Sequence, residues 1–308
     1  MSVVAIVLPV FLVILLGAVL ARTGFLRAEL IAELNRLTYY VGLPAYLFSS
    51  IAGATFGGGR AATLFGVMAG ASLFVLFVGY AVAKLRRVPA ESLGSFLHAA
   101  IRGNLAYIGL PVVTLALTAH GADRLRQVAL LAMAPLVVVT NTLGVLLLLV
   151  GHQKPGPAML RSLTWQLVSN PLLLASGAGV ACAAGGGLLP AWVLQTVAVT
   201  GQLALPLALL CIGGTLVVMP LRGKRTTAFL ASLLKVGVAP LLGWPLARWA
   251  GLSPDEMRIT LLFLAAPTAA ASFTLAGKLG GDEALAASSV VLSTVLSIVS
   301  LSAVLALV

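Results

Sequence analysis

Charged residues are scarce in this chain, and acidic residues are the scarcest of them. Charged side chains make up 9% of its 308 residues, against about 25% in an average soluble domain. Hydrophobic residues make up 60%, and the mean hydropathy is +1.11. A soluble core does not need this much apolar material, so we predict an all-α polytopic membrane protein.

Cysteine and the motifs of enzyme chemistry are also nearly missing. Cys182 and Cys211 both lie in apolar runs, which predicts buried thiols instead of a disulfide framework. The sequence has no nucleotide-binding glycine loop, zinc motif or serine-hydrolase elbow, so we expect no enzyme, resident metal or cofactor. His98, His120 and His152 lack metal-ligand spacing and lie at span ends or in a loop, which predicts interfacial roles.

Long apolar runs fill most of the sequence. Crossing ~30 Å of hydrocarbon takes about 20 helical residues, and ten windows of roughly that length occur. They cover residues 3–21, 36–55, 61–83, 92–119, 124–150, 163–184, 189–219, 227–249, 256–277 and 284–307. Arg22 and Arg27 follow the first run and no basic residue precedes it, so we predict a retained first span and not a signal peptide.

The net charge of +11 has a topological explanation and does not indicate nucleic-acid binding. Basic residues concentrate in cytoplasmic loops. Loops after odd-numbered spans hold twelve: Arg22, Arg27, Arg36, Lys84, Arg86, Arg87, Lys154, Arg161, Arg222, Lys224, Arg225 and Lys278. Loops after even-numbered spans hold five: Arg60, Arg124, Arg126, Arg248 and Arg258. We therefore predict that both termini lie outside.

Landmark residues recur at a nearly constant shift along the chain. A shift of 162 residues relates Pro9 to Pro171, Gly17 to Gly179 and Pro44 to Pro206, and a shift of 156 relates Pro111 to Pro267. We interpret this as a duplication, with one five-helix repeat over 1–150 and a second over 163–308. Because five is odd, the second copy enters the membrane inverted, as in many secondary transporters.

Two prolines of this pattern predict broken helices in spans 4 and 9. Proline lacks an N–H and clashes with the preceding turn, so the helices should break at Pro111 and Pro267, with Gly109 easing the first break. The alternative for each proline is a simple packing kink. Breaks would leave second half-helices starting near Val112 and Thr268, whose electropositive N-termini favour anions.

Polar side chains lie near both predicted breaks. Neutral donors for a bound anion are Asn104, Thr114, Thr268 and Ser272, although Asn104 could instead form an interhelical hydrogen bond. Arg102 and Lys235 lie inside spans 4 and 8, where they either attract organic anions or extend to the cytoplasmic surface. No Asp or Glu lies clearly within a span, which favours an anionic substrate. Coupling to Na⁺ through backbone carbonyl, hydroxyl and amide oxygens stays open.

Five segments together resemble the auxin efflux carrier family, which includes plant auxin exporters and bacterial carriers such as malonate transporters. They are NLAYIGLP (104–111), SNPLLLA (169–175), PLALLCIGGTL (206–216), LLKVGVAPLL (233–242) and APTAAASFTLAGKLGGDEALAASSVVLSTVLS (266–297). The resemblance implies the ten-helix fold of the sodium–bile acid symporters, in which helices 4 and 9 cross. It implies a scaffold domain of spans 1, 2, 6 and 7 (about 1–55 and 163–219), with homodimerisation through helices 2 and 7. Spans 3–5 and 8–10 (about 61–150 and 227–308) would form the transport domain.

The same resemblance implies that Asn104 binds the substrate carboxylate at the crossover. The stretch APTAAASF has no matching asparagine, so Thr268 or Ser272 would have to take its place. Plant exporters carry a long cytoplasmic segment between spans 5 and 6, which this chain lacks.

These observations predict a bacterial inner-membrane secondary transporter of small carboxylates that works by elevator-like alternating access. The expected partners are the substrate anion and the lipid bilayer. One alternative is a sodium-coupled symporter of larger amphipathic anions, and another is a non-transporting receptor or scaffold.

Overall fold

The computed structural model describes residues 3–52, 59–118, 123–150, 161, 164–165, 168–185, 189–219 and 225–308. Three basic residues used in the topology count (Lys154, Arg222 and Lys224) lie outside these ranges, as do His120 and His152. Within them the chain is helical, and its only β-type pairing is one isolated bridge.

The elements follow the predicted spans in order. The first half holds α1 (Val3–Arg22), α2 (Ala28–Leu37), η1 (Thr38–Gly42), α3 (Leu43–Ala52), α4 (Gly59–Leu85), α5 (Ala90–Ile101), η2 (Leu105–Gly109), α6 (Leu110–Thr118) and α7 (Asp123–Val150). The second half holds α9 (Pro171–Ala184), α10 (Ala191–Gln202), α11 (Ala204–Val218), α12 (Arg225–Leu233), η3 (Leu234–Val238), α13 (Ala239–Trp249), α14 (Pro254–Ala265), α15 (Ala271–Lys278) and α16 (Glu283–Leu307). The η segments are π-helical turns.

Six stretches of the described chain are long and apolar enough to cross a membrane as continuous helices. They are Val3–Arg22, Gly59–Leu85, Asp123–Leu149, Ala191–Val218, Arg225–Trp249 and Glu283–Leu307. Two shorter apolar helices, Leu105–Leu117 and Pro171–Ala184, accompany them. The six long stretches coincide with predicted spans 1, 3, 5, 7, 8 and 10.

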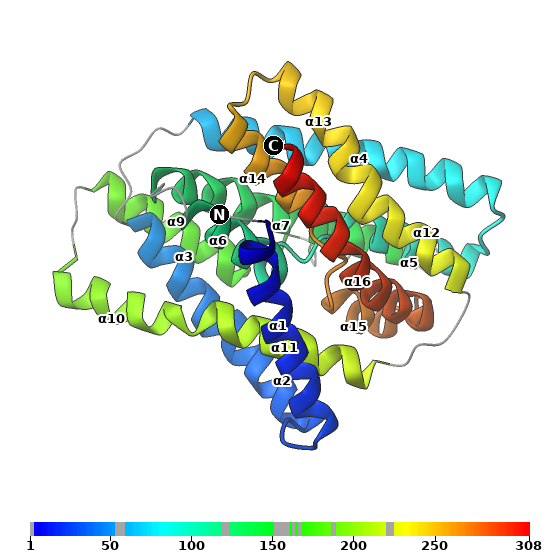
Figure 1. Cartoon of the computed structure of the whole chain (residues 1–308), viewed down its shortest axis with the longest axis horizontal. Coiled ribbons are helices and arrows are strands. Elements are labelled where there is room, and N and C mark those ends of the chain that lie inside the picture. The colour runs from blue at the N-terminus through cyan, green and yellow to red at the C-terminus, as the bar shows by residue number, and fades with distance from the viewer. Residues whose placement is uncertain are drawn as a thin grey trace.

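The helices form two groups by their contacts (Figure 1). In one group α1 packs on α11, α3 packs on α9 and α10, and α2 packs on α11. In the other, α4 packs on α5, α7 and α13, and α16 packs on α12, α14 and α15. Elements from both halves of the sequence thus contribute to each group.

Two glycine contacts in the first group are related by the same shift as the sequence landmarks. A Cβ atom on Gly17 of α1 would collide with the carbonyl oxygen of Leu210 in α11. A Cβ on Gly179 of α9 would lie 3.2 Å from the carbonyl oxygen of Phe48 in α3. Adding 162 to Gly17 and Phe48 gives Gly179 and Leu210, so these two contacts, one between α1 and α11 and one between α9 and α3, are equivalent under the shift.

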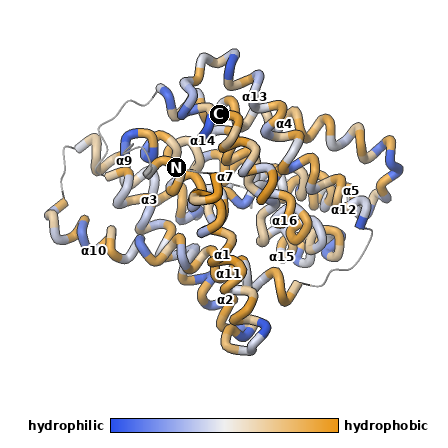
Figure 2. Tube along the Cα trace, viewed as in Figure 1, coloured by the Kyte–Doolittle hydropathy of each residue, from blue (hydrophilic) through white to orange (hydrophobic). Residues whose placement is uncertain are grey.

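Apolar side chains cover the outside of the molecule as well as its interior (Figure 2). Phe77 in α4 and Leu241 in α13 are more than two-thirds exposed, and hydrophilic residues gather mainly at helix ends. Trp192 and Trp249 lie at the ends of α10 and α13, which is where tryptophan meets the membrane–water interface. This outward apolar surface is that of a helix bundle in lipid.

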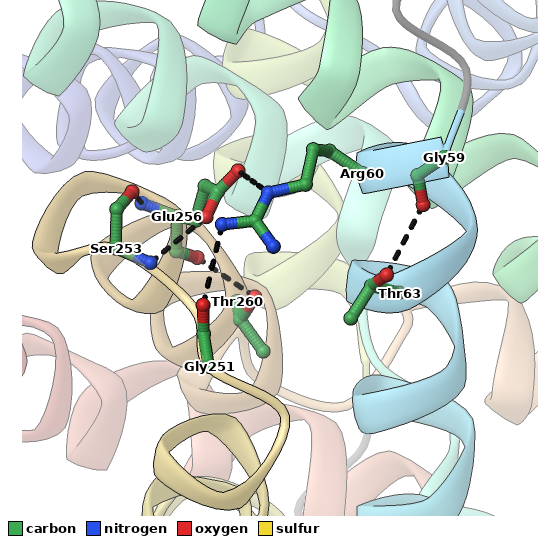
Figure 3. A network of polar contacts seen from close by, with 7 residues as sticks. All are labelled: Gly59, Arg60, Thr63, Gly251, Ser253, Glu256 and Thr260. Atoms are coloured by element: carbon green, nitrogen blue, oxygen red, sulfur yellow. Dashed lines mark hydrogen bonds and ion pairs between the residues drawn. The ribbon is translucent and has the colours of Figure 1, made fainter.

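Polar contacts at the helix ends tie distant segments together. Nε of Arg60, at the start of α4, donates to Oε1 of the buried Glu256 at 2.8 Å (Figure 3). Glu256 also forms a capping box with Ser253 at the start of α14. At the starts of α5 and α16, Oγ of Ser92 donates to the carboxylate of Asp282 at 2.7 Å.

Candidate functional site

The first helix interruption lies in predicted span 4, between α5 and η2. Helix α5 ends at Ile101, Arg102 continues in extended backbone (φ −85°, ψ 100°), and η2 begins at Leu105. The prediction of a break at Pro111, with a half-helix starting near Val112, is wrong. Both residues lie inside α6, which continues directly from η2.

A π-helical turn explains why Pro111 leaves its helix unbroken. In η2 the N–H of Gly109 donates at 3.0 Å to the carbonyl oxygen of Asn104, five residues back, and the N–H of Leu110 donates to that of Leu105. Proline has no N–H, and in an α-helix its ring crowds the carbonyl four residues back. A wider turn just before the proline moves that carbonyl out of register, so the helix continues.

The second interruption lies in predicted span 9. Helix α14 ends at Ala265, α15 begins at Ala271, and Pro267 lies between them as predicted. Ala266 is extended (ψ 138°), the conformation that a following proline favours. The second half-helix thus begins three residues later than the start predicted near Thr268.

The two interruptions are joined backbone to backbone, at a junction that we call the crossing. The N–H of Asn104 donates to the carbonyl oxygen of Pro267 at 2.6 Å, and the N–H of Ala269 donates to that of Arg102 at 3.0 Å. These bonds make an antiparallel bridge between Gly103 and Thr268. Helices α5 and α14 therefore end, and η2 and α15 begin, at one place inside the bundle.

Thr268 holds the crossing together from the second interruption. Its N–H donates to Oγ of Ser293 in α16 at 3.0 Å, and its hydroxyl donates to the carbonyl oxygen of Ala99 in α5 at 2.8 Å. The hydroxyl that we predicted as a substrate ligand already has a backbone acceptor.

Two polar side chains at the crossing, those of Asn104 and Ser272, form no hydrogen bond with the described residues. Asn104 is the N-cap residue of η2 and is 6% exposed, yet its amide makes no capping bond and no other bond within the described chain. Oγ of Ser272, in the first turn of α15, is buried and has no partner there either. Each lies at the electropositive start of a helix, where free backbone N–H groups need a hydrogen-bond acceptor.

Arg102 lies buried at the end of α5. It is the C-cap residue and 7% exposed, and its Nε donates to Oδ1 of Asn141 in α7 at 2.7 Å. Its Nη1 is buried and finds no hydrogen-bond partner among the described residues. The guanidinium is therefore only partly satisfied by the protein.

Lys235 lies on the other side of the crossing. It belongs to η3, is 3% exposed, and its Nζ donates to the carbonyl oxygen of Leu264 at the end of α14 (2.5 Å). A Cβ on Gly103 would lie 3.0 Å from Cε of this lysine, so its side chain packs against the crossing. Neither Lys235 nor Arg102 has an acidic partner in the described chain, and their burial contradicts the alternative of extension to the membrane surface.

The remaining predicted site residues lie beyond the crossing, in or next to α6. Gly109 packs against Phe263 and Ala266, and Val112 is fully buried. The hydroxyl oxygen of Thr114 lies 3.4 Å from that of Tyr46 in α3. These residues shape the packing between the two helix groups.

Our prediction from the sequence missed several polar residues around the crossing. Asn141 and Ser293 are polar side chains inside predicted spans 5 and 10, a signal that identifies intramembrane hydrogen-bonding sites. His98 was expected at the membrane interface, but it is buried on α5, where a Cβ on Gly144 of α7 would lie 2.5 Å from its ring. The described residues contain no group of three His, Cys, Asp or Glu side chains that could hold a metal ion.

Comparison with known proteins gives matches along nearly the whole chain. The family described as "Membrane transport protein" matches residues 2–154 and 137–305. A protein of Rhizobium meliloti (strain 1021) named "Putative malonate transporter" is 26% identical over 307 residues, which cover 98% of this chain and 94% of the relative. A protein of Methanothermobacter thermautotrophicus named "Uncharacterized transporter" is 27% identical over 305 residues, covering 96% and 95%.

Proposed function

Because this chain belongs to the membrane transport protein family, we propose that it is a secondary transporter of small organic anions, with the crossing as its substrate site. The chain is a transporter-family membrane protein and carries apolar helices long enough to span a bilayer. The nature of the substrate and the mechanism are the parts that we infer.

One observation carries the substrate class: Arg102 and Lys235 are buried at the crossing and have no acidic partner in the described chain. A buried charge without a counter-ion is costly. A substrate anion would supply the missing charge. The starts of η2 and α15 point the positive ends of their dipoles toward the same place, and Asn104 and Ser272 offer unengaged polar atoms there.

A carboxylate is the anion that we favour. The two oxygens of a carboxylate lie in one plane and can accept hydrogen bonds from a guanidinium, an amide and backbone N–H groups at the same time. The relative from Rhizobium meliloti carries the name of a carrier for malonate, which is a small carboxylate.

We infer an elevator-like mechanism from the arrangement of the helices. The helix group around α4–α7 and α12–α16 would carry the crossing as a transport domain, and the group of α1–α3 and α9–α11 would form the scaffold. The equivalence of the Gly17–Leu210 and Gly179–Phe48 contacts under the 162-residue shift supports two inverted repeats. Homodimerisation through helices 2 and 7 (α2–α3 and α10–α11) and placement in a bacterial inner membrane complete the proposal.

Transport by an Asn104→Ala variant tests the site. The purified full-length protein is reconstituted in liposomes, and counterflow of radiolabelled malonate, succinate and propionate is measured. Because the side-chain amide of Asn104 has no partner in the described chain and its backbone bonds survive the substitution, the variant should fold normally and lose about tenfold or more in transport.

Asn35→Ala on α2 provides the matched control, because it removes the same amide and leaves the backbone carbonyl that accepts from Tyr107 of η2. Full transport by Asn104→Ala would remove the crossing as the substrate site. Absence of carboxylate counterflow by the wild-type protein would remove the proposed function itself.

A further inference from the structure

A polar cavity of about 210 Å³ lies between the two helix groups, next to the crossing. Its walls come from η1, from α7 and from the start of α9. Of the eight described lining residues, six carry a hydroxyl or a side-chain amide, and none of the eight is acidic. The lining residues are Tyr39, Tyr40, Val138, Asn141, Thr142, Ser169, Asn170 and Pro171.

Arg102 is connected to this cavity through one of its lining residues. Its Nε donates to Oδ1 of Asn141 at 2.7 Å. Its Nη1 is a buried donor without a partner in the described chain. A guanidinium with hydrogen-bond donors that are only partly occupied therefore lies behind the cavity wall.

A helix start adds positive potential to the cavity. The start of α9, a helix of 14 residues, faces it with the positive end of its dipole. Asn170 already accepts from the N–H groups of Leu172 and Leu173, so α9 contributes its field and not free donors. Nδ2 of Asn170 lies 3.5 Å from the Tyr39 hydroxyl, which completes a polar rim suited to an anion.

We propose that this cavity is a second carboxylate subsite, which binds the far carboxylate of a dicarboxylate whose first carboxylate lies at Asn104. This inference rests on the proposed function, and it assigns Arg102 and Asn141 as the residues that select for a second negative charge. A cavity of this volume holds a carboxylate and a short carbon chain.

The backbone of the crossing places the two subsites at a suitable separation. Arg102 and Asn104 are two residues apart around the bridged Gly103, and extended backbone rises about 3.3 Å per residue. Side chains two residues apart in extended backbone leave the chain on the same side. Their starting points are thus about 6 to 7 Å apart, a distance that two flexible side chains can close onto the ends of a three- or four-carbon diacid.

An Asn141→Asp variant tests the subsite. It changes one side-chain atom and places a carboxylate 2.7 Å from Nε of Arg102, so the protein itself then neutralises the guanidinium. Competition against labelled malonate counterflow is measured with two chain-matched pairs, malonate against propionate and succinate against butyrate. For the wild type we expect each diacid to compete at a concentration about tenfold lower than its monoacid partner. In Asn141→Asp this ratio should fall to about one.

Gln127→Glu is the matched control, because it makes the same amide-to-acid change on the same helix but near the start of α7, away from Arg102. It should keep the wild-type ratio. Arg102→Gln is the second variant and should lose the diacid preference in the same way.

Equal competition by diacids and monoacids in the wild type would overturn the second subsite, as would an unchanged ratio in Asn141→Asp. Either result leaves the proposed function standing as long as carboxylate counterflow occurs. If the wild type shows no carboxylate counterflow at all, it is the proposed function that fails.

Discussion

Arg102 and Lys235 both lie at the C-terminal end of a half-helix. Arg102 caps α5, and the Lys235 ammonium bonds the carbonyl oxygen of Leu264 in the last turn of α14. Helix C-termini carry a partial negative charge, and unpaired carbonyls there accept from cations. The two cations thus have local partners that lower the cost of burial.

The position of Lys235 leads to a prediction about ion coupling. In sodium-coupled carriers, carbonyl oxygens at the C-terminal ends of broken helices coordinate Na⁺. Here the ammonium takes up one such carbonyl and packs against Gly103. We expect malonate counterflow to be the same in sodium and in choline buffers. We also expect Lys235→Met to lose transport in both.

Asn35→Ala serves again as a control for handling and reconstitution. Sodium-dependent uptake by the wild type would contradict this prediction and would favour the symporter of amphipathic anions as the better description of the protein.

Glu256 leads to a prediction about stability at the helix ends. It accepts from Arg60 at 2.8 Å and from the N–H of Ser253 at 2.8 Å, while its side chain is nearly buried. Glu256→Gln weakens both the ion pair and the capping box, so we expect a loss of about 1 to 2 kcal/mol in the free energy of unfolding. Thermal unfolding in detergent measures it.

The exposed pair of Glu33 and Arg36 provides the comparison, because its atoms are 3.9 Å apart and both side chains are about 70% exposed. Glu33→Gln should leave the melting temperature unchanged. Equal effects of the two substitutions would mean that burial of Glu256 does not matter.

At the scale of helices, the three π-helical turns share one sequence context. Each ends two residues before a proline: η1 before Pro44, η2 before Pro111 and η3 before Pro240. The wider turn is the means by which these helices tolerate proline in their interior. The three spans that contain these prolines are therefore continuous at the proline, including span 4, for which we predicted a break at Pro111.

This comparison shows what sequence reasoning could and could not predict. The break at Pro267 was predictable, because both the proline and the residue before it disfavour helix. The break at Arg102–Asn104 was not, because no proline marks it and bonds to the second interruption, more than 160 residues away, hold it open. Asn104 was predicted near a break at Pro111, seven residues further along, whereas the structure interrupts the helix at Arg102–Asn104. Asn141 escaped notice because its partner, Arg102, lies on another helix.

Close packing of α1 on α11 leads to a prediction at the same scale. A Cβ on Gly213 would collide with the carbonyl oxygen of Ile14. Because the atoms that it meets all belong to the backbone, no side chain can move aside to make room. We expect Gly213→Ala to destabilise the protein by about 3 kcal/mol or more. Unfolding by heat in detergent provides the measurement.

Gly66 in α4 is the matched control, because a Cβ there meets nothing within 4 Å. Gly66→Ala should be neutral or slightly stabilising, since alanine is the better helix former. A Gly213→Ala variant as stable as Gly66→Ala would contradict the close approach of α1 and α11.

At the scale of the whole molecule, the helix ends sort into two faces. One face holds Arg60, Gly251 and Val308. Nη2 of Arg60 donates to the carbonyl oxygen of Gly251, and Nη2 of Arg258 in α14 donates to that of Val308. The other face holds Ser92 and Asp282, at the far ends of α5 and α16. The basic loops after spans 3 and 9 lie on this second face.

This division leads to a prediction of orientation. Because basic loops stay in the cytoplasm, we expect the second face inside the cell and Val308 outside. Alkaline phosphatase fused after Val308 should be active in a bacterial host, and green fluorescent protein at the same position should be dark. The same reporters fused after Arg87 should give the reverse result. Fluorescence from the Val308 fusion would show that the orientation is wrong.

The backbone bonds between Asn104, Pro267, Arg102 and Ala269 limit how the molecule can change shape. Separating the two interrupted helices would strand several amide groups in a medium that offers them no other acceptor. In the elevator-like mechanism that we propose, helices 4 and 9 should therefore move together as one rigid unit, with any sliding confined to the contacts of that unit with its neighbours. A covalent link between residues 103 and 268 should consequently leave malonate counterflow unchanged, whereas a link from α6 to α3 should stop it.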